Sequence, residues 1–259
     1  MKVFTENNKK QVKNTYVEIL LNNIVDKDIQ MMLMPLNFMQ TIFACPKYLI
    51  RDNFIFPNNT LVNFLSFCGT FLSVFLCCYC VYTISIVNCI KKLYAYFCFT
   101  TFIDLCATCI GFIVNFLVNS HITQINVCFV LAIQEVNRIL NDKRMFKFYL
   151  ILNWISVVLV FVISVCNIIM INKLIKHLPF YLVWSLFNYS IFDHNMVYAM
   201  RLMHLLHIKT TLWIKYTSKW RVTAYNRKEN VKNIFNTYVK LLECYRLYKE
   251  TFQTLVREI

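Results

Sequence analysis

Glycine and acidic residues are scarce in this chain. Only two of its 259 residues are glycine, four are proline and 13 are acidic, against 27 lysines and arginines. So little glycine and proline excludes a loop-rich β-protein and a low-complexity chain. Charged residues make up 15% of the sequence, where soluble domains carry about 25%. Together with 58% hydrophobic residues, this indicates an all-α membrane protein.

Motifs of catalytic sites are also missing. There is no G-x-S-x-G, no P-loop, no H-E-x-x-H and no glycine-rich fingerprint, so we expect no enzyme and no cofactor. His204-x-x-His207 and Cys106-x-x-Cys109 lack the further ligands that a metal site needs, and we expect no metal. Nine of the 12 cysteines lie in or beside apolar stretches, where a free thiol behaves as a small apolar group. We therefore expect no disulfide framework.

The N-terminal segment shows no secretory signal. Residues 1–14 are basic but lack an apolar core and a small-residue cleavage site. The first membrane span is therefore expected to act as the targeting element.

Four stretches are apolar and long enough to cross a bilayer: residues 61–86, 95–118, 145–171 and 178–207. The first has 26 residues without a charge and would reach about 39 Å as a helix. The second contains Asp104, and the fourth contains Asp193, His194 and Arg201. Such residues are costly in lipid and usually face protein or a wet cavity. The sequence predicts a polytopic helical bundle with four transmembrane helices, spanning residues 61–214.

The flanking segments are expected to be cytoplasmic. In the N-terminal segment, residues 1–60, the first 30 residues predict an amphipathic helix. The stretch Met31–Phe43 that follows is too short to span and would lie at the interface or on the bundle. His121–Asp142 predicts an amphipathic helix that stays on one side. Residues 215–259 predict a basic amphipathic helix with apolar positions at Ile234, Val239, Leu242, Tyr245, Tyr248, Phe252 and Leu255.

The positive charges predict the orientation. Twenty-two of the 27 lysines and arginines flank one side of the four spans, and four flank the other. Because cytoplasmic flanks carry the excess of lysine and arginine, both ends of this chain are expected in the cytoplasm of a multi-pass protein of the cell membrane. The outer loops are then very short, and a ligand would have to bind among the helices.

Three segments resemble the insect gustatory receptor family, particularly its moth-like members. They are residues 33–60 (LMPLNFMQTIFACPKYLIRDNFIFPNNT), residues 191–206 (IFDHNMVYAMRLMHLL) with the LWI at 212–214, and residues 233–256 (NIFNTYVKLLECYRLYKETFQTLV). The match extends over nearly the whole chain from Leu33 onward, in the family's order.

The resemblance implies a taste chemoreceptor subunit for sensory perception and signal transduction. Members of the family have seven spans and an intracellular N-terminus, and four subunits form a ligand-gated cation channel. The pore helix belongs to the seventh span, whereas this chain stops before the fifth. The resemblance therefore implies a partial sequence without the pore helix, whose parent forms a homo- or hetero-tetramer and binds a small-molecule tastant. Sugar, bitter and carbon dioxide receptors share these features, so the ligand stays open.

The resemblance also suggests candidate site residues. It places the ligand pocket in the outer half of the bundle, where the residues available are Tyr96, Phe97, Asp104, Trp184, Asn188 and Tyr189. The alternative is that these are lipid-facing or core aromatics, with Asp104 in a structural hydrogen bond.

Asp193, His194 and Arg201 are candidates for a coupling or structural role. Arg201 lies about 35 Å along the fourth helix, near the cytoplasmic boundary, where a snorkelling arginine is the simpler interpretation. It is too far from Asp193 to touch it on one helix.

Another function class stays open. The chain could be a complete four-span scaffold or transporter of an unrelated family, although no inverted repeat is visible. The basic terminal helices favour contact with anionic membrane lipid or a partner subunit over nucleic acid.

Overall fold

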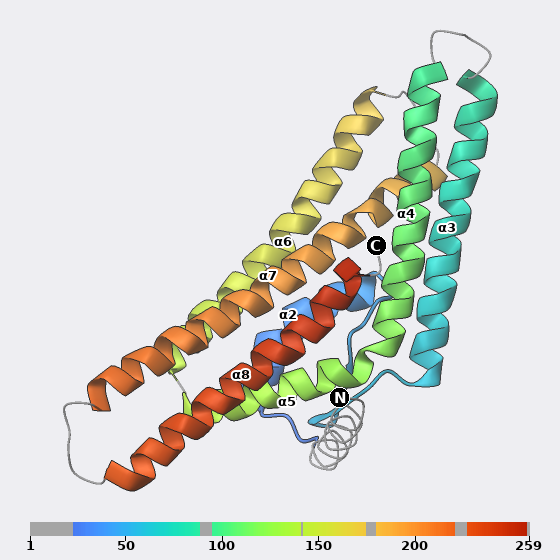
Figure 1. Cartoon of the computed structure of the whole chain (residues 1–259). Coiled ribbons are helices and arrows are strands. Elements are labelled where there is room, and N and C mark those ends of the chain that lie inside the picture. Colours follow the sequence, from blue (N-terminus) through green and yellow to red (C-terminus); the bar gives the residue numbers. More distant parts are fainter. Residues whose placement is uncertain (1–22, 89–94, 141, 175–179, 221–226, 258–259) are drawn as a thin grey trace.

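The computed structural model describes residues 23–88, 95–140, 142–174, 180–220 and 227–257 (Figure 1). In these ranges the backbone forms seven α-helices and one hairpin: α2 (Lys27–Ile42), β1 (Leu49–Arg51), β2 (Phe54–Phe56), α3 (Thr60–Asn88), α4 (Ala95–His121), α5 (Thr123–Ile139), α6 (Lys143–Leu174), α7 (Phe180–Trp220) and α8 (Arg227–Arg257). The predicted helical class is confirmed. Most of the amphipathic helix expected in residues 1–30 lies outside the described residues.

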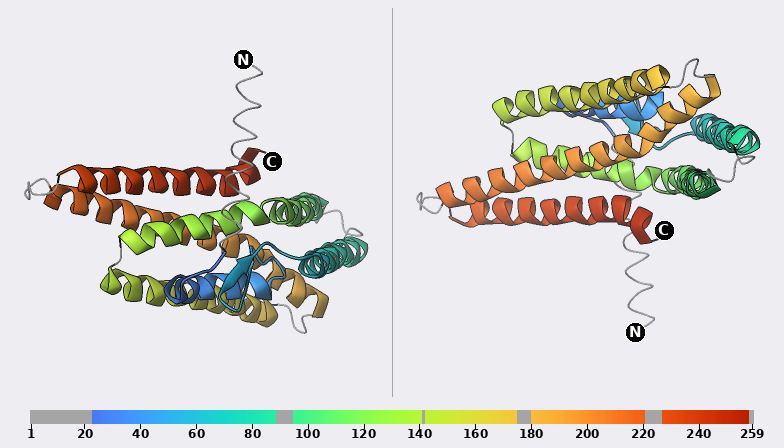
Figure 2. Two further views of the ribbon diagram at one scale, coloured as in Figure 1. Left: turned by 90° about the horizontal axis from the view of Figure 1, so that it is seen from below. Right: turned by 90° about the horizontal axis from the view of Figure 1, so that it is seen from above.

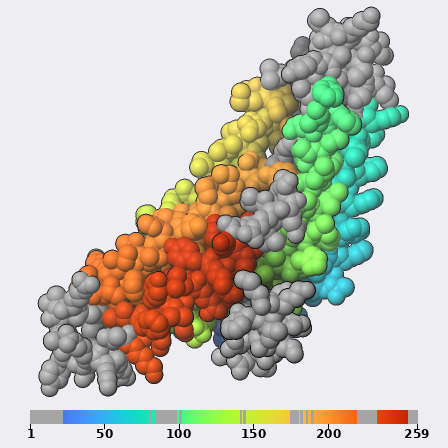
Figure 3. Space-filling view, viewed as in Figure 1, coloured from blue at the N-terminus to red at the C-terminus, as the bar shows by residue number. Residues whose placement is uncertain are grey.

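Three of the helices are long and apolar enough to cross a membrane. The suitable stretches are Thr60–Cys80 in α3, Phe102–His121 in α4 and Met145–Lys173 in α6. They overlap three of the four predicted spans. At most a third of each stretch is buried inside the protein, and Figure 3 shows the side chains of α3 projecting along one edge of the molecule. Apolar helix surfaces of this size are rare on soluble monomers and suit a lipid environment.

The fourth predicted span lies within α7, which is not among these three helices in the described part of the chain. With 41 residues, α7 is about 61 Å long, twice the hydrocarbon thickness of a bilayer. Part of the helix must therefore lie outside a membrane even if the rest crosses one.

The helices pack mainly in antiparallel pairs. α3 pairs with α4, α6 with α7, and α7 with α8, while α5 lies along α8 (Figure 1). The views from below and from above place α5 and α7 in the middle, between α8 on one face and α2 with α6 on the other (Figure 2). α7 is therefore the element that connects the apolar helices with α8.

The main core lies around α2 and α5. α2 keeps Pro35 inside its helix and buries Ile29, Leu33, Leu36 and Met39 fully. α5 was predicted to be amphipathic, but 11 of its 17 residues are buried. Because α8 covers one side of α5 and the N-terminal segment another, polar positions of α5 end up inside the protein.

The predicted apolar face of α8 is partly wrong. Val239 and Leu242 are 45% and 49% exposed, whereas Leu241, Cys244 and Leu247 are the buried positions. Tyr245, Tyr248 and Phe252 are partly buried against the core as predicted, so the error is confined to aliphatic positions such as Val239 and Leu242.

The hairpin was not predicted. Its turn residues Asp52 and Asn53 have φ values of 53° and 66°. Positive φ at both central positions is what a two-residue hairpin needs, and Asp and Asn tolerate it better than most residues. The main-chain N–H of Val25 donates to the carbonyl of Asn53 (2.8 Å), which attaches the N-terminal segment to the hairpin.

All ten described cysteines are free thiols. Cys77 and Cys80 are buried as expected, but four others in the apolar helices lie on the helix surface: Cys68, Cys78, Cys106 and Cys166. Those four face outward from the bundle and do not fill its core.

Candidate functional site

A cleft of about 460 Å³ lies between α6 and α7. Its volume is within the range of small-molecule pockets. The polar lining residues are Ser164, Asn167, Ser190 and Asp193. The apolar lining residues are Val160, Ile163, Ile168, Met170, Ile171 and Leu186.

The packing of α6 against α7 gives the cleft a polar and an apolar end. The rings of Phe161 and His194 lie 5.1 Å apart, and Arg201 Nε is 2.8 Å from Asn153 Oδ1, so the two helices run antiparallel. In this register Asp193 lies beside residues 160–164 of α6, and Leu186 lies beside residues 168–171. Charge and hydroxyl groups therefore gather at one end of the cleft, beside Val160 and Ile163, whereas the lining at the other end is apolar.

The polar end offers hydrogen-bond acceptors. The hydroxyl of Ser164 donates to the carbonyl of Val160 (2.9 Å), and that of Ser190 donates to the carbonyl of Phe187 (2.6 Å). Each hydroxyl donates its only proton within its own helix, and its oxygen keeps lone pairs that can accept a hydrogen bond. The Asp193 side chain is exposed to the cleft and forms no ion pair with any residue that the structure describes.

His194 points away from this cleft. It is 1% exposed, and its ring lies 4.1 Å from the ring of Phe43. Its Nδ1 hydrogen-bonds the carbonyl of Ser190, whereas Nε2 has no partner among the described residues. The adjacent side chains of Asp193 and His194 therefore point in different directions: Asp193 faces the cleft, and His194 is buried between helices.

A chain of buried amides joins α7 to α4. Asn195 Nδ2 donates to Asn115 Oδ1 (3.2 Å), and Asn115 in turn reaches the sulfur of Cys45 (3.4 Å). One helical turn on, Asn119 Nδ2 donates to the carbonyl of Cys45 (3.1 Å), and its oxygen accepts from Lys47 Nζ (2.5 Å). The segment that follows α2 is therefore held against α4 by polar contacts.

Lys47 is an unexpected buried cation. Its side chain is 2% exposed, and burial lowers the pKa of its ammonium group to about 8. Lys209 of α7 resembles it: it contacts Asn137 and the carbonyl of Leu140, and burial lowers its pKa to about 8. Neither residue stood out in the sequence, because a lysine in a polar segment usually indicates a solvated surface.

Arg201 does not snorkel. Its guanidinium lies 4.7 Å from the ring centre of Tyr149 and donates to Asn153, whose own amide donates to the carbonyl of Met32 (2.8 Å). It also lies 3.3 Å from Nδ1 of His204. The structure favours a structural role over the snorkelling interpretation, because α6 supplies Arg201 with the buried partners Tyr149 and Asn153.

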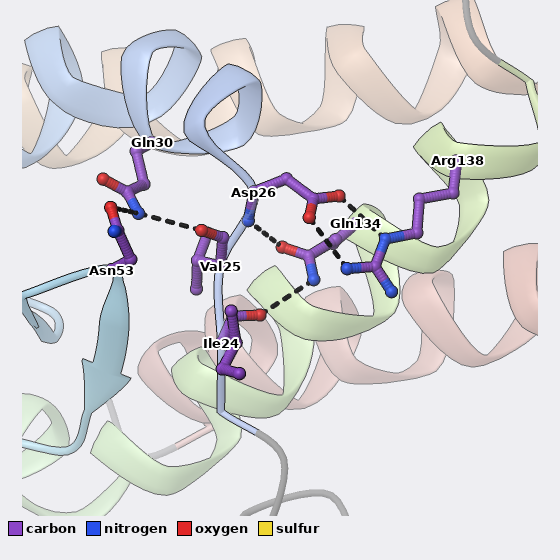
Figure 4. Close-up of polar contacts among 7 residues, drawn as sticks. All are labelled: Ile24, Val25, Asp26, Gln30, Asn53, Gln134 and Arg138. Atoms are coloured by element: carbon purple, nitrogen blue, oxygen red, sulfur yellow. Dashed lines mark hydrogen bonds and ion pairs between the residues drawn. The ribbon is translucent and has the colours of Figure 1, made fainter.

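A second polar cluster attaches the N-terminal segment to α5 (Figure 4). Gln134 is 4% exposed; its Oε1 accepts from the amide of Asp26 (2.7 Å) and its Nε2 donates to the carbonyl of Ile24 (2.9 Å). Arg138 donates twice to the carboxylate of Asp26, both at 2.8 Å. Its guanidinium lowers the pKa of Asp26. We call Asp26, Gln134 and Arg138 the clasp.

None of the predicted ligand residues whose side chains the structure describes lines the cleft. The side chains of Tyr96, Phe97, Asn188 and Tyr189 lie outside the described residues. Asp104 is exposed on α4 and does not line the cleft, and Trp184 is half-buried beside Phe180. Of the predicted coupling residues, Asp193 lines the cleft, while His194 and Arg201 pack between helices.

Sequence reasoning missed Ser164, Asn167 and Ser190. Ser164 and Asn167 are three residues apart, so they lie on one face of α6. Two polar side chains on one face of an apolar span were an available signal, but it does not say which helix they face.

Comparison with known proteins identifies no relative: no family model, no curated protein and no solved structure matches the chain.

Proposed function

We propose that this chain is part of a chemoreceptor subunit of the insect gustatory type, and that its small-molecule ligand binds in the cleft between α6 and α7. The observation that carries the proposal is the cleft. It combines a volume of about 460 Å³ with an exposed carboxylate, in a bundle three of whose described helices are long and apolar enough to cross a membrane. Ionisable groups at such places are usually functional.

The proposal includes a fourth crossing by residues 180–207 of α7, with both ends of this chain in the cytoplasm. The polar residues His194 and Arg201 are turned into the bundle, whereas Met196, Met200 and Met203 are 62%, 53% and 40% exposed. This helix thus offers lipid an apolar stripe and shields His194 and Arg201. The excess of lysine and arginine beside the cytoplasmic ends supports the same orientation.

α7 supplies a direct connection between the cleft and the cytoplasmic helices. From Ala199 onward it contacts α8 by two hydrogen bonds. The hydroxyl of Tyr248 in α8 donates to the carbonyl of Ala199 (3.2 Å), and Nε1 of Trp213 in α7 donates to the carbonyl of Ile234 (3.2 Å). A ligand that fits one arrangement of α6 and α7 better than another would shift the population toward that arrangement. α8 would follow, because it is bonded to the same rigid helix.

In this proposal the described helices bind the ligand, and the resemblance assigns conduction to a seventh span in a tetramer. The test is a calcium response in cells that express the seven-span parent, screened with a panel of tastants. Ile163→Trp, which fills the cleft, is expected to abolish the response. Val162→Trp is the control, because Val162 is the adjacent residue of α6, is 50% exposed and does not line the cleft.

Loss of the response in both variants, or in neither, would contradict the assignment of the ligand to this cleft. A scaffold or transporter of an unrelated family would give no tastant-dependent calcium signal in the wild-type parent.

A further inference from the structure

We infer that the cleft between α6 and α7 selects an organic cation: a protonated amine with an apolar body. This inference rests on the proposed function, because it takes the cleft as the ligand site of the receptor. It adds the chemical class of the ligand, which the resemblance leaves open.

The charge of the lining is the first argument. Asp193 is the only ionisable residue among the lining residues that the structure describes. No basic side chain of the described ranges neutralises it. A carboxylate between apolar helices is unfavourable alone, and a cationic ligand would supply the missing partner.

The second argument is the balance of donors and acceptors. Ser164 and Ser190 give their hydroxyl protons to main-chain carbonyls of their own helices, so they present lone pairs to the cleft. With the carboxylate of Asp193, the polar end therefore offers three side-chain acceptors, and Asn167 is the one lining side chain that can also donate. An ammonium group, which only donates, fits this set better than a carboxylate or a polyol does.

The third argument is the position of the charge. Asp193 lies at the end of the cleft beside Val160 and Ser164, and the aliphatic side chains of Ile168, Ile171 and Leu186 line the other end. Residues 160–171 of α6 extend over about 16 Å. A molecule with its amine at one end and a hydrocarbon or aromatic body behind it would place each part against matching groups.

Three probes with one carbon skeleton test the class: 4-phenylbutylamine, 4-phenylbutan-1-ol and 4-phenylbutyrate, which are cationic, neutral and anionic at pH 7. Each is titrated into the whole 259-residue chain in nanodiscs of zwitterionic phosphatidylcholine, and empty nanodiscs correct for partition into lipid. We expect the amine to bind at least tenfold more tightly than the alcohol and the acid not to bind, since a hydrogen bond to a charged group contributes a tenfold effect or more.

Two substitutions locate the effect. Asp193→Asn is expected to remove the tenfold preference for the amine, and Asp193→Lys to transfer the preference to the acid. Asp28→Asn is the control, because it removes an exposed carboxylate in the first turn of α2, away from the cleft. It is expected to leave the affinity for the amine unchanged.

The outcomes separate this inference from the proposed function. If amine and alcohol bind equally and Ile163→Trp abolishes both, the cleft binds ligands but the cation class is wrong; an acyl chain of lipid in the cleft would give the same equality. If Ile163→Trp leaves binding of the amine intact, the proposed ligand site itself is wrong. No binding of the amine at millimolar concentration would overturn the inference.

Discussion

Removing the neutral Gln134 is expected to loosen the N-terminal segment more than removing the charged Arg138, although Arg138 forms the ion pair of the clasp. Gln134 is buried and bonds two main-chain groups, the amide of Asp26 and the carbonyl of Ile24. Gln134→Leu leaves both without a partner. At about 1–3 kcal/mol for each unsatisfied buried group, and at the lower end because both are partly buried, the cost is ~2–3 kcal/mol.

The Arg138 contribution is smaller because water screens it. The side chains of Arg138 and Asp26 are 55% and 35% exposed, and exposed ion pairs of this kind contribute ~0.5–1 kcal/mol. Arg138→Gln should therefore cost less than half as much as Gln134→Leu. Glu135→Gln is a suitable control, since it breaks another exposed ion pair of α5, with Lys240, without touching the clasp.

The assay is hydrogen–deuterium exchange at the amide of Asp26 and at the amide of Ile55, which donates to the carbonyl of Asn23 (2.9 Å). We expect both amides to exchange much faster in Gln134→Leu, slightly faster in Arg138→Gln, and unchanged in Glu135→Gln. Equal acceleration in Arg138→Gln and Gln134→Leu at pH 7 would refute the reasoning.

The pH dependence separates the two contributions further. The pKa of Asp26 is lowered because Arg138 donates hydrogen bonds to its carboxylate. A carboxyl group whose pKa is lower in the folded state stabilises that state above its unfolded pKa of about 3.9, and the stabilisation is lost as the pH falls through the folded pKa. Below about pH 4 the stability of the wild type should therefore approach that of Arg138→Gln. Gln134→Leu should stay less stable than both, because the side-chain amide of Gln134 does not titrate and its loss is felt at every pH.

Three other substitutions test buried contacts through unfolding in detergent. Lys47 has a folded pKa of about 8, below its ordinary 10.5, so the unfolded chain binds the extra proton and the free energy of unfolding rises between pH 8 and 10. Lys47→Met should lack this gain, and an equal gain in both proteins would count against a buried ammonium. Gly69→Ala should cost ~1–3 kcal/mol, because the new Cβ at position 69 would lie 2.9 Å from the Cβ of Ala44. Adding Ala44→Gly should restore stability, because it removes that Cβ and because glycine suits the φ of 53° at position 44. A double variant as unstable as Gly69→Ala would contradict this packing. Asn153→Ala should cost ~2–4 kcal/mol, because it removes the hydrogen bond from Arg201 and the one to the carbonyl of Met32. A loss below 1 kcal/mol would contradict these contacts of Asn153.

The sequence predicted the apolar helices well, because span length and hydropathy are local properties. Thr60–Cys80, Phe102–His121 and Met145–Lys173 lie close to the predicted spans 61–86, 95–118 and 145–171. The fourth span stays a prediction, since α7 carries Asp193 and Arg201 and continues well beyond the thickness of a bilayer.

What the sequence could not provide is the partner of each polar side chain. Gln134 is a polar residue in a segment predicted to form an amphipathic helix, yet the N-terminal segment and α8 bury it. Lys47 and Arg201 look like solvated cations until the helices that contact them are placed. The cleft is a product of the same contacts, because Ser164 and Asp193 are 29 positions apart and meet only when α6 and α7 pack in one register.

The hairpin was missed for a different reason. Asp52-Asn53 is a recognisable turn signal for a short loop, because both residue types tolerate a positive φ. The three prolines nearby predict helix boundaries, and strands of three residues are too short to show a periodic pattern.

The most direct test of the membrane topology is a series of reporter fusions after Lys92, Asp142, Lys176 and Ile259, each scored for location inside or outside intact cells. Four crossings with a cytoplasmic N-terminus predict reporters outside after Lys92 and Lys176, and inside after Asp142 and Ile259. A reporter found outside after Ile259 would mean that α7 does not cross, and the proposed receptor architecture would be contradicted.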